Sequence, residues 1–356
     1  MPELATISVD SDDDLEALIE QSVREKWGDG LPFVPPTAER VERALARIAI
    51  DPDHPIGVVQ PSGATATVRN VTVNAIMAGC SVSHLPLVFA VTEAICNPLF
   101  NLRAIQVTTH PVGVAGFVSG PLAAAFGVNA GGNAFGPGNR ANATVGRAIR
   151  LVMLNIGGGI PGLVDKATFG SPAKYTWFFA ERQEQSPWPS WVERSGAAGD
   201  SSTVTVFGAG GFLNLMETTS SADQLLDAFA LSMAAPNNND HLLCGEPLLV
   251  LCPEHARVLS SGGYSVADVQ RRLWETARLP VRSFTMSART YRLGPTWTDI
   301  LGELTEESLI PPSRDPEHIR IVVSGGSGRH SVYVPSTGAT PSCSASLDPY
   351  AQLLKA

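Results

Sequence analysis

The spacing of apolar residues in the first fifty positions predicts a helical arm at the N-terminal end. Residues 12–27 have the periodicity of an amphipathic helix, and its apolar face consists of Leu15, Leu18, Ile19 and Val23. The glycines and prolines of residues 28–36 end this helix and favour an extended segment. A second amphipathic helix is expected over residues 37–48, with Thr37 as its cap. We therefore assign residues 1–50 to an N-terminal helical arm.

Beyond residue 50, short apolar runs typical of strands alternate with longer helical patterns. The expected helices cover residues 71–77, 85–95, 141–155, 222–234 and 266–277. The expected strands cover residues 104–108, 112–118, 203–207, 247–252 and 319–324. This alternation predicts an α/β fold with a mixed sheet and glycine-rich loops at strand ends. Residues 51–195 and 196–356 share the order strand, glycine loop, helix, so we expect two similar α/β halves.

Composition narrows the class of protein. The 356 residues are 44% hydrophobic, which supports a large core and excludes a disordered chain. The net charge of −9 excludes a nonspecific nucleic-acid binder, because such proteins need a basic surface. No apolar run reaches the roughly 18 residues of a membrane-spanning helix. Five widely spaced cysteines without a CxxC pair, and no secretory signal, predict a cytoplasmic protein with free thiols.

A glycine-rich loop before residue 141 is a candidate anion site. Its glycines allow close backbone approach, and the helix that follows directs N–H groups at a bound anion. A guanidinium at the start of that helix adds a full positive charge. The residues expected to bind a small carboxylate or phosphate are Gly131, Gly132, Asn133, Gly138, Asn139 and Arg140. The alternative interpretation is a structural loop with tight turns.

A second glycine loop follows the strand expected over residues 319–324. Ligand loops in open α/β sheets commonly occupy such positions. We expect Gly325, Gly326 and Arg329 to contact substrate and His330 to act as an acid or base. A lone histidine after a glycine turn is also compatible with a purely structural role.

Cys80 and His84 form a Cys-x3-His pair just before the buried helix. A thiol near a helix N-terminus has a lowered pKa and is nucleophilic, so Cys80 is a candidate nucleophile with His84 or His110 as acid or base. The three residues are alternatively a set of metal ligands. The remaining interpretation is a buried small apolar cysteine beside a capping histidine.

Basic residues follow the triple glycine of residues 157–159. Lys166 and Lys174 are candidates for binding an anion, and Tyr175 is a candidate proton donor. Lys166 and Tyr175 would stabilise negative charge that develops during a reaction. A solvated loop with a local ion pair explains the same pattern.

Several segments together resemble a bacterial family of unassigned activity that is associated with, or fused to, UGSC-type (seleno)proteins. These segments are Trp27–Pro32, Met77–Cys80, Phe100–Arg103, Thr108–Pro111, Gly136–Thr144, Asp165–Thr168, Ser186–Trp188 and Ser324–Gly326. The UGSC partner resembles selenium- or thiol-dependent reductase subunits. The resemblance therefore implies thiol or selenol chemistry on a small metabolite. This chain has no Cys-Gly-Ser-Cys motif of its own.

These observations lead to one functional hypothesis and two alternatives. We expect a cytoplasmic enzyme that acts on a small anionic metabolite through the Cys80 thiol, in redox or carbon–heteroatom bond chemistry, without a cofactor. The first alternative is a lyase or hydrolase that binds a transition metal through cysteine and histidine. The second is a noncatalytic subunit that binds a UGSC-type partner. The proline segment and the tryptophan-containing loop of residues 187–191 also favour a homodimer.

Overall fold

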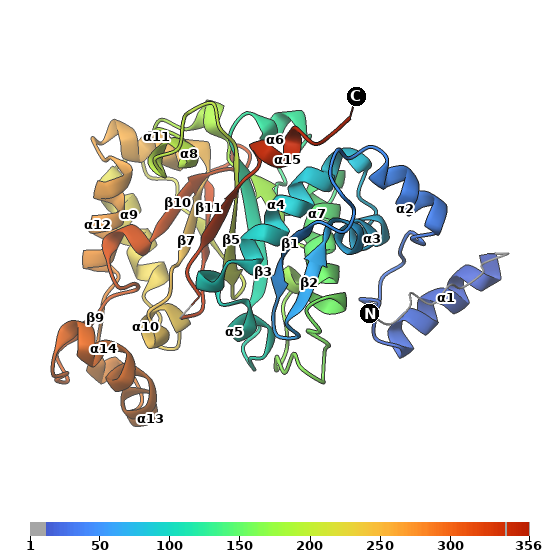
Figure 1. Cartoon of the computed structure of the whole chain (residues 1–356). Helices are drawn as coiled ribbons and strands as arrows, with labels where there is room; N and C mark the ends of the chain where they lie inside the picture. The colour runs from blue at the N-terminus through green and yellow to red at the C-terminus, as the bar shows by residue number, and fades with distance from the viewer. Residues whose placement is uncertain (1–11, 339, 356) are drawn as a thin grey trace.

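Two four-stranded mixed sheets lie face to face at the centre of the molecule (Figure 1). The structure, a computed structural model, describes residues 12–338 and 340–355. The strands of the first sheet are β3 (Gly113–Ser119), β4 (Phe178–Ala180), β5 (Thr203–Ala209) and β12 (Cys343–Ser346). Their order is β12-β5-β3-β4, and only β3 and β4 are parallel. The expected α/β class with mixed sheets is confirmed.

The second sheet has one parallel pair and two antiparallel pairs. Its strands are β6 (Leu213–Met216), β7 (Leu248–Leu251), β10 (Arg320–Val323) and β11 (His330–Val334). Their order is β10-β7-β11-β6, with β7 and β10 parallel. The outer face of this sheet is covered by α9 (Ala222–Met233), α11 (Pro253–Ser261) and α12 (Val266–Thr276).

Strand β3 explains why both faces of the first sheet are apolar. Its seven residues are all buried. Because side chains alternate along a strand, Val114 and Val118 enter one core while Ala115 and Phe117 enter another. The second of these cores lies between the two sheets and also contains Val250 of β7. The molecule is therefore layered as helices, sheet, sheet and helices.

The outer face of the first sheet packs against two long helices, α4 (Leu85–Cys96) and α7 (Arg140–Asn155). Helix α4 is buried on nearly every side, as its uniformly apolar sequence predicts. Helix α3 (Val68–Ala78) packs against α4 and α7. It begins three residues earlier than expected because Thr67 forms a capping box with Asn70.

Smaller elements surround these layers. Near the N-terminus lie α1 (Asp12–Arg24), α2 (Ala38–Leu45) and the hairpin of β1 (Pro55–Val59) and β2 (Ala64–Thr67). The short helices are α5 (Leu102–Gln106), α6 (Leu122–Ala125), α8 (Trp191–Arg194), α10 (Asn239–Leu243) and α15 (Asp348–Ala351). An appendage with a small core of its own projects at the lower left of Figure 1. It contains β8 (Leu279–Pro280), α13 (Met286–Ala288), α14 (Gly294–Leu301) and β9 (Leu309–Ile310).

Two expectations about local structure are wrong. Residues 104–108 do not form a strand, because Leu102, Ile105 and Gln106 are buried at the spacing of one helical face, that of α5. The tryptophan-containing segment of residues 187–191 is not a plain loop, because Ser190 caps the short helix α8, which begins at Trp191.

The sheets cut across the boundary expected between residues 195 and 196. Strands β5 and β12 come from residues 196–356, yet both belong to the sheet that contains β3 and β4. Residues 1–11 of the expected N-terminal arm lie outside the described residues.

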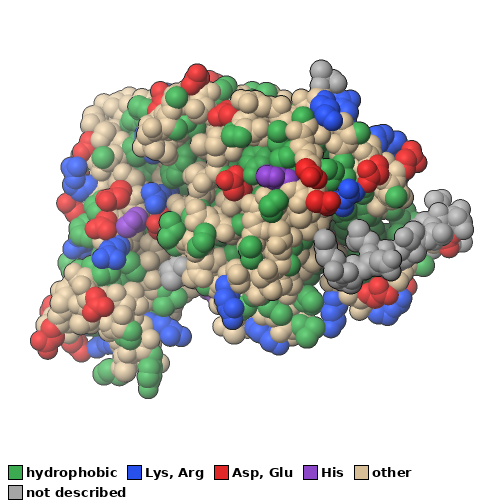
Figure 2. Space-filling view, viewed as in Figure 1, with side chains coloured by type: hydrophobic (Ala, Val, Ile, Leu, Met, Phe, Trp, Pro, Cys, Tyr) green, Lys and Arg blue, Asp and Glu red, His purple; other side chains and the backbone are tan. Residues whose placement is uncertain are grey.

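Two further observations concern the distribution of charge on the surface and the hydropathy of the helices. Acidic and basic side chains are interspersed over the face that Figure 2 shows. None of the described helices is long and apolar enough to span a membrane.

Candidate functional site

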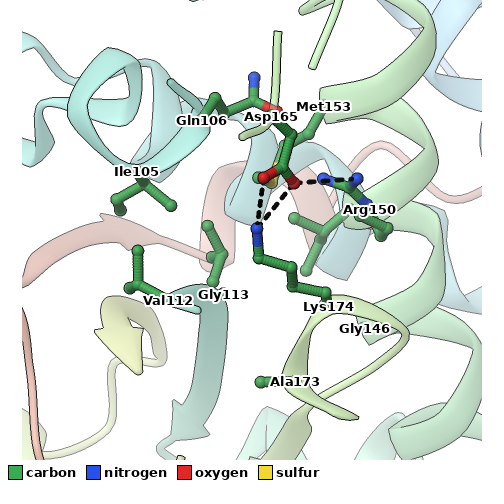
Figure 3. A pocket seen from close by; sticks show the side chains of 12 residues that line it. Ile105, Gln106, Val112, Gly113, Gly146, Arg150, Met153, Asp165, Ala173 and Lys174 are labelled. Atoms are coloured by element: carbon green, nitrogen blue, oxygen red, sulfur yellow. Dashed lines mark hydrogen bonds and ion pairs between the residues drawn. The ribbon is translucent and has the colours of Figure 1, made fainter. Parts of the chain in front are cut away.

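A pocket lies where α5, β3, α7 and the segment of residues 157–176 meet (Figure 3). The space between its lining atoms is about 310 Å³, part of it open solvent, and the pocket has room for only about one water molecule. The lining residues are Ile105, Gln106, Val112, Gly113, Val114, Gly146, Ile149, Arg150, Met153, Asp165, Ala173 and Lys174. Most of these side chains are apolar, and the polar ones converge on one side.

The carboxylate of Asp165 lies between two cations in this pocket (Figure 3). The ammonium nitrogen of Lys174 donates to both carboxylate oxygens, at 2.7 and 2.6 Å. The guanidinium of Arg150 lies 3.6 Å from Oδ2 on the other side. The three side chains are only 6%, 13% and 10% exposed for Asp165, Lys174 and Arg150. The cluster therefore carries two positive charges against one negative charge in a poorly hydrated place.

Glycines bring the 157–176 segment close to the two elements beneath it. A Cβ atom at Gly146 of α7 would lie 2.4 Å from the hydroxyl of Thr176. A Cβ atom at Gly113 of β3 would lie 2.9 Å from the backbone of Ala173. Side chains at either position would push the segment outward. The two glycines thus allow Lys174 to reach Asp165 under cover of the fold.

Gln106 contributes an acceptor without a partner. The residue is 1% exposed, and its amide nitrogen donates to the carbonyl of Gln60. Its Oε1 atom is buried and has no hydrogen-bond partner among the described residues. A buried carbonyl oxygen without a donor is energetically unfavourable, by about 1–3 kcal/mol. A ligand or water that donates a hydrogen bond at this point would remove that penalty.

Burial changes the protonation of the basic groups here. It lowers the pKa of Lys174, although the hydrogen bond to Asp165 opposes this shift, and the charge of Arg150 lowers it further. Burial also lowers the pKa of His110, and the nearby charge of Lys174 acts in the same direction. The Nδ1 atom of His110 is buried without a partner among the described residues. Lysines with a lowered pKa are typical of general bases and nucleophiles.

Residues 29–31 of the N-terminal segment contact α7 close to the pocket. Arg147, one helical turn before Arg150, forms a two-pronged ion pair with Asp29 at 2.8 and 2.9 Å. Its guanidinium also donates to the carbonyl of Leu31. The charge of Asp29 partly offsets the lowering of the pKa of Arg150. Arg147 is thus an anchor for residues 29–31, whereas Arg150 faces the pocket.

The structure places Cys80 apart from this pocket and makes it a poor nucleophile. Burial raises the pKa of its thiol to about 12, although the Thr144 hydroxyl and the charge of Arg140 lower it slightly. The lowered pKa expected from a position near a helix start is therefore wrong. His84 is buried and lies near Arg140. His110, in contrast, lies near Lys174, so the three expected partners are divided between two places.

In the first glycine loop, the asparagine side chains form hydrogen bonds with nearby backbone groups. Asn139 caps α7 by accepting from the backbone of Asn142, and its amide donates to the carbonyl of Gly127. Gly131 donates to the side chain of Asn129, whose amide donates to the carbonyl of Gly132. The amide of Asn133 donates to the carbonyl of Pro137, and Gly138 has the positive φ of 108° that favours glycine.

The guanidinium of Arg140 forms hydrogen bonds with the end of another helix. Its Nε and Nη2 atoms donate to the carbonyl of Gly79, at 3.0 and 2.9 Å. Gly79 is the residue that ends α3 in a left-handed conformation. Arg140 therefore connects the end of α3 to the start of α7, which is the structural alternative to anion binding.

The second glycine loop contacts the first. The Gly325 nitrogen donates to the carbonyl of Ala130, and a Cβ atom at Gly326 would lie 2.9 Å from the Cα of Gly132. Arg329 donates to the carbonyls of Thr218 and Thr219. The two predicted loops thus come together, but their contact is between backbones.

The other predicted catalytic residues are scattered. Lys166 and Tyr175 are exposed on the 157–176 segment, and Lys166 donates to the carbonyl of Gly162. His330 is exposed at the start of β11 beside Asn214. The described residues contain no group of three or more histidine, cysteine or acidic side chains placed to hold a metal ion.

Sequence reasoning included Lys174 but missed Arg150, Asp165 and Gln106 as site residues. The spacing of Arg147 and Arg150 contained part of the signal, since residues three positions apart on a helix are neighbours on its surface. Comparison with family models, with curated proteins and with solved structures finds no match to this chain.

Proposed function

We propose that the protein is an enzyme that binds a small anionic metabolite in the pocket of Arg150 and Lys174. One observation carries this proposal: two buried cations share a single carboxylate, so the pocket has an unbalanced positive charge. Unpaired buried charge is unfavourable, and a bound anion would balance it. A carboxylate suits Arg150, because only its Nη2 has a protein acceptor among the described residues and a guanidinium has five N–H donors.

The pocket also favours catalysis over simple storage of an anion. Lys174 donates a hydrogen bond to Asp165 at the wall of the pocket, and the lowered pKa of Lys174 brings its proton transfer nearer to neutral pH. The chemistry therefore rests on Lys174 and Asp165, and Cys80 supports it only through the packing of α7. All five cysteines are free, which favours a reducing compartment, and we propose a cytoplasmic location. Association with a UGSC-type partner and homodimer formation stay predictions.

Titration with small carboxylates tests the binding. Acetate and lactate are added to the full chain and followed by NMR, with inorganic phosphate as a second anion. Arg150→Ala should weaken carboxylate binding by roughly ten- to a hundredfold, since a charge-assisted hydrogen bond contributes about 1.5–3 kcal/mol. The exposed Arg43, paired with Glu39 on α2, provides the matched control Arg43→Ala, which should bind normally.

The same titration defines failure. If no anion binds saturably, or if Arg150→Ala binds as tightly as the unmodified chain, the proposal is wrong. Near-UV circular dichroism of each variant establishes that a loss of binding does not reflect a loss of fold.

A further inference from the structure

We propose that Lys174 forms an imine with the carbonyl carbon of a small oxo acid whose carboxylate binds Arg150. This inference rests on the proposed function and specifies the substrate class and the nucleophile. It depends on the position of one amine at the wall of the pocket, beside a guanidinium and a carboxylate (Figure 3).

The choice of lysine at this position is itself informative. The chain has four lysines, and Lys26, Lys166 and Lys355 are exposed, whereas the Lys174 side chain is 13% exposed. The other well-buried ion pair of this region uses arginine, in Arg147. Arginine is better suited to a purely structural buried pair because its planar fork matches a carboxylate. Lysine adds what arginine lacks, an amine that can lose its proton and attack carbon.

Asp165 is placed to take that proton. Its two oxygens lie 2.7 and 2.6 Å from the Lys174 nitrogen, within proton-transfer distance. An adjacent cation, here Arg150, is one of the arrangements that activate lysines for attack on carbonyl groups. Burial and this neighbouring charge both lower the pKa of Lys174, which increases the fraction of neutral amine.

The step balances without any further reagent. Lys174 passes a proton to Asp165, and its nitrogen lone pair forms a bond to the carbonyl carbon. The carbonyl π electrons move to oxygen, which takes up the proton that the attacking nitrogen now loses, and the product is a neutral carbinolamine. Asp165 then protonates the carbinolamine hydroxyl, the C–O bond breaks and water leaves. The products are a protonated imine and one water molecule.

The remaining lining residues fit the same ligand. Gln106 also lines the pocket, and its buried Oε1, close to Gly159, is an acceptor without a partner among the described residues. The side chains of Ile105, Ile149 and Met153 form an apolar wall for a short hydrocarbon part. The pocket has room for only about one water molecule, so glyoxylate and pyruvate, the smallest oxo acids, are the ligands of choice, and their entry requires the lining side chains to move apart.

Reductive trapping tests the proposal on the intact chain. Glyoxylate or pyruvate is added with sodium cyanoborohydride, and the reduced adduct is located by mass spectrometry of peptides. A lowered pKa raises the fraction of neutral amine at neutral pH, and Arg150 would hold the carboxylate of the oxo acid beside Lys174. We therefore expect labelling at Lys174 to exceed that at each exposed lysine. Lys174→Arg should abolish the preferred adduct, and Lys166→Arg, on the same segment, should retain it.

Lactate separates this proposal from the one on which it rests. It has a carboxylate but no carbonyl group, so it should protect Lys174 from labelling without forming an adduct. Lactate binding that depends on Arg150, without preferential trapping at Lys174, would overturn the imine and leave the anion site standing. If neither lactate nor the oxo acids bind, both proposals fall. Peptide mapping of the unmodified chain decides the matter even if Lys174→Arg does not fold.

Discussion

Asp240 is a fully buried carboxyl group with several donors at hydrogen-bond distance. Ser336 donates to it from both its backbone and its hydroxyl, at 3.0 and 2.6 Å, and the Tyr333 hydroxyl donates at 2.5 Å. Burial nevertheless raises the pKa of Asp240 from 3.8 to about 6, because these hydrogen bonds only partly replace water. The native state therefore holds this proton more tightly than the unfolded chain does.

This shift predicts a pH dependence of stability. Between about pH 4 and 6 the unfolded chain releases the Asp240 proton first, so stability from this group falls as pH rises. The contribution is complete below about pH 4 and is lost above about pH 6, on the order of 3 kcal/mol. Urea unfolding at several pH values measures the free energy of unfolding of the wild-type chain and of Asp240→Asn. The difference between the two free energies should change between about pH 4 and 6. A difference in free energy that stays constant across this pH range would contradict the prediction. An Asp240 carboxyl group that NMR shows to have a pKa near 4 would contradict it as well.

At the scale of single residues, charged candidates for the site could be identified from the sequence more easily than the residues they contact. Lys174 was a candidate anion ligand because its segment is basic and follows a triple glycine. Arg150 and Gln106 could not be identified, because each faces the pocket only through the way α5 and α7 pack on β3. The reactivity of Cys80 was misjudged because local spacing contains no information about burial, which dominates its thiol pKa.

At the scale of elements, Arg140 connects two helices. Its two hydrogen bonds to the Gly79 carbonyl hold the end of α3 against the start of α7. Because the residue is exposed, Arg140→Ala should lower the free energy of unfolding by only about 1 kcal/mol. Binding of acetate in the Arg150 pocket should be unchanged.

Urea unfolding and the acetate titration measure the two quantities on one variant. Arg43→Ala again serves as the control, with stability near that of the unmodified chain. If Arg140→Ala has unchanged stability but binds acetate more weakly, the first glycine loop is an anion-binding site after all.

Elements with long periodic patterns were predictable, and short ones were not. Helices α4, α7, α9 and α12 lie close to their expected ranges. Each has a long, regular pattern of apolar residues, and these residues are buried in the structure. Strand β12 was missed because its four residues have no strong pattern and are held by pairing, as in Cys343 opposite Val206. Cys343 is consequently buried.

At the scale of the molecule, the first sheet joins parts of the chain that the sequence pattern had separated. β3 pairs with β5 along its whole length, from Gly113 opposite Ala209 to Ser119 opposite Thr203. A fragment of residues 1–195 would lack β5, so that one edge of β3 is unpaired. It would also lack about half of the residues in the core between the sheets. We expect it to aggregate or remain unfolded, because an unpaired apolar strand is prone to association.

Circular dichroism and analytical ultracentrifugation of that fragment measure the outcome. Co-expression with residues 196–356 provides the control, since it restores β5 and β12. A fragment that is monomeric and unfolds cooperatively by itself would show that residues 1–195 form an independent domain. The α/β class was predictable from local periodicity, but the four layers depend on long-range pairing that no local pattern specifies.

The pairing of β12 with β5 also has a consequence for the order of events during synthesis. Roughly 130 residues separate the end of β5 from the start of β12, and translation at about 5–20 residues per second takes roughly 7–26 s to produce them. Throughout that interval the growing polypeptide has an open edge on β5. We therefore expect this edge to be open to pairing with other strands until the ribosome delivers β12.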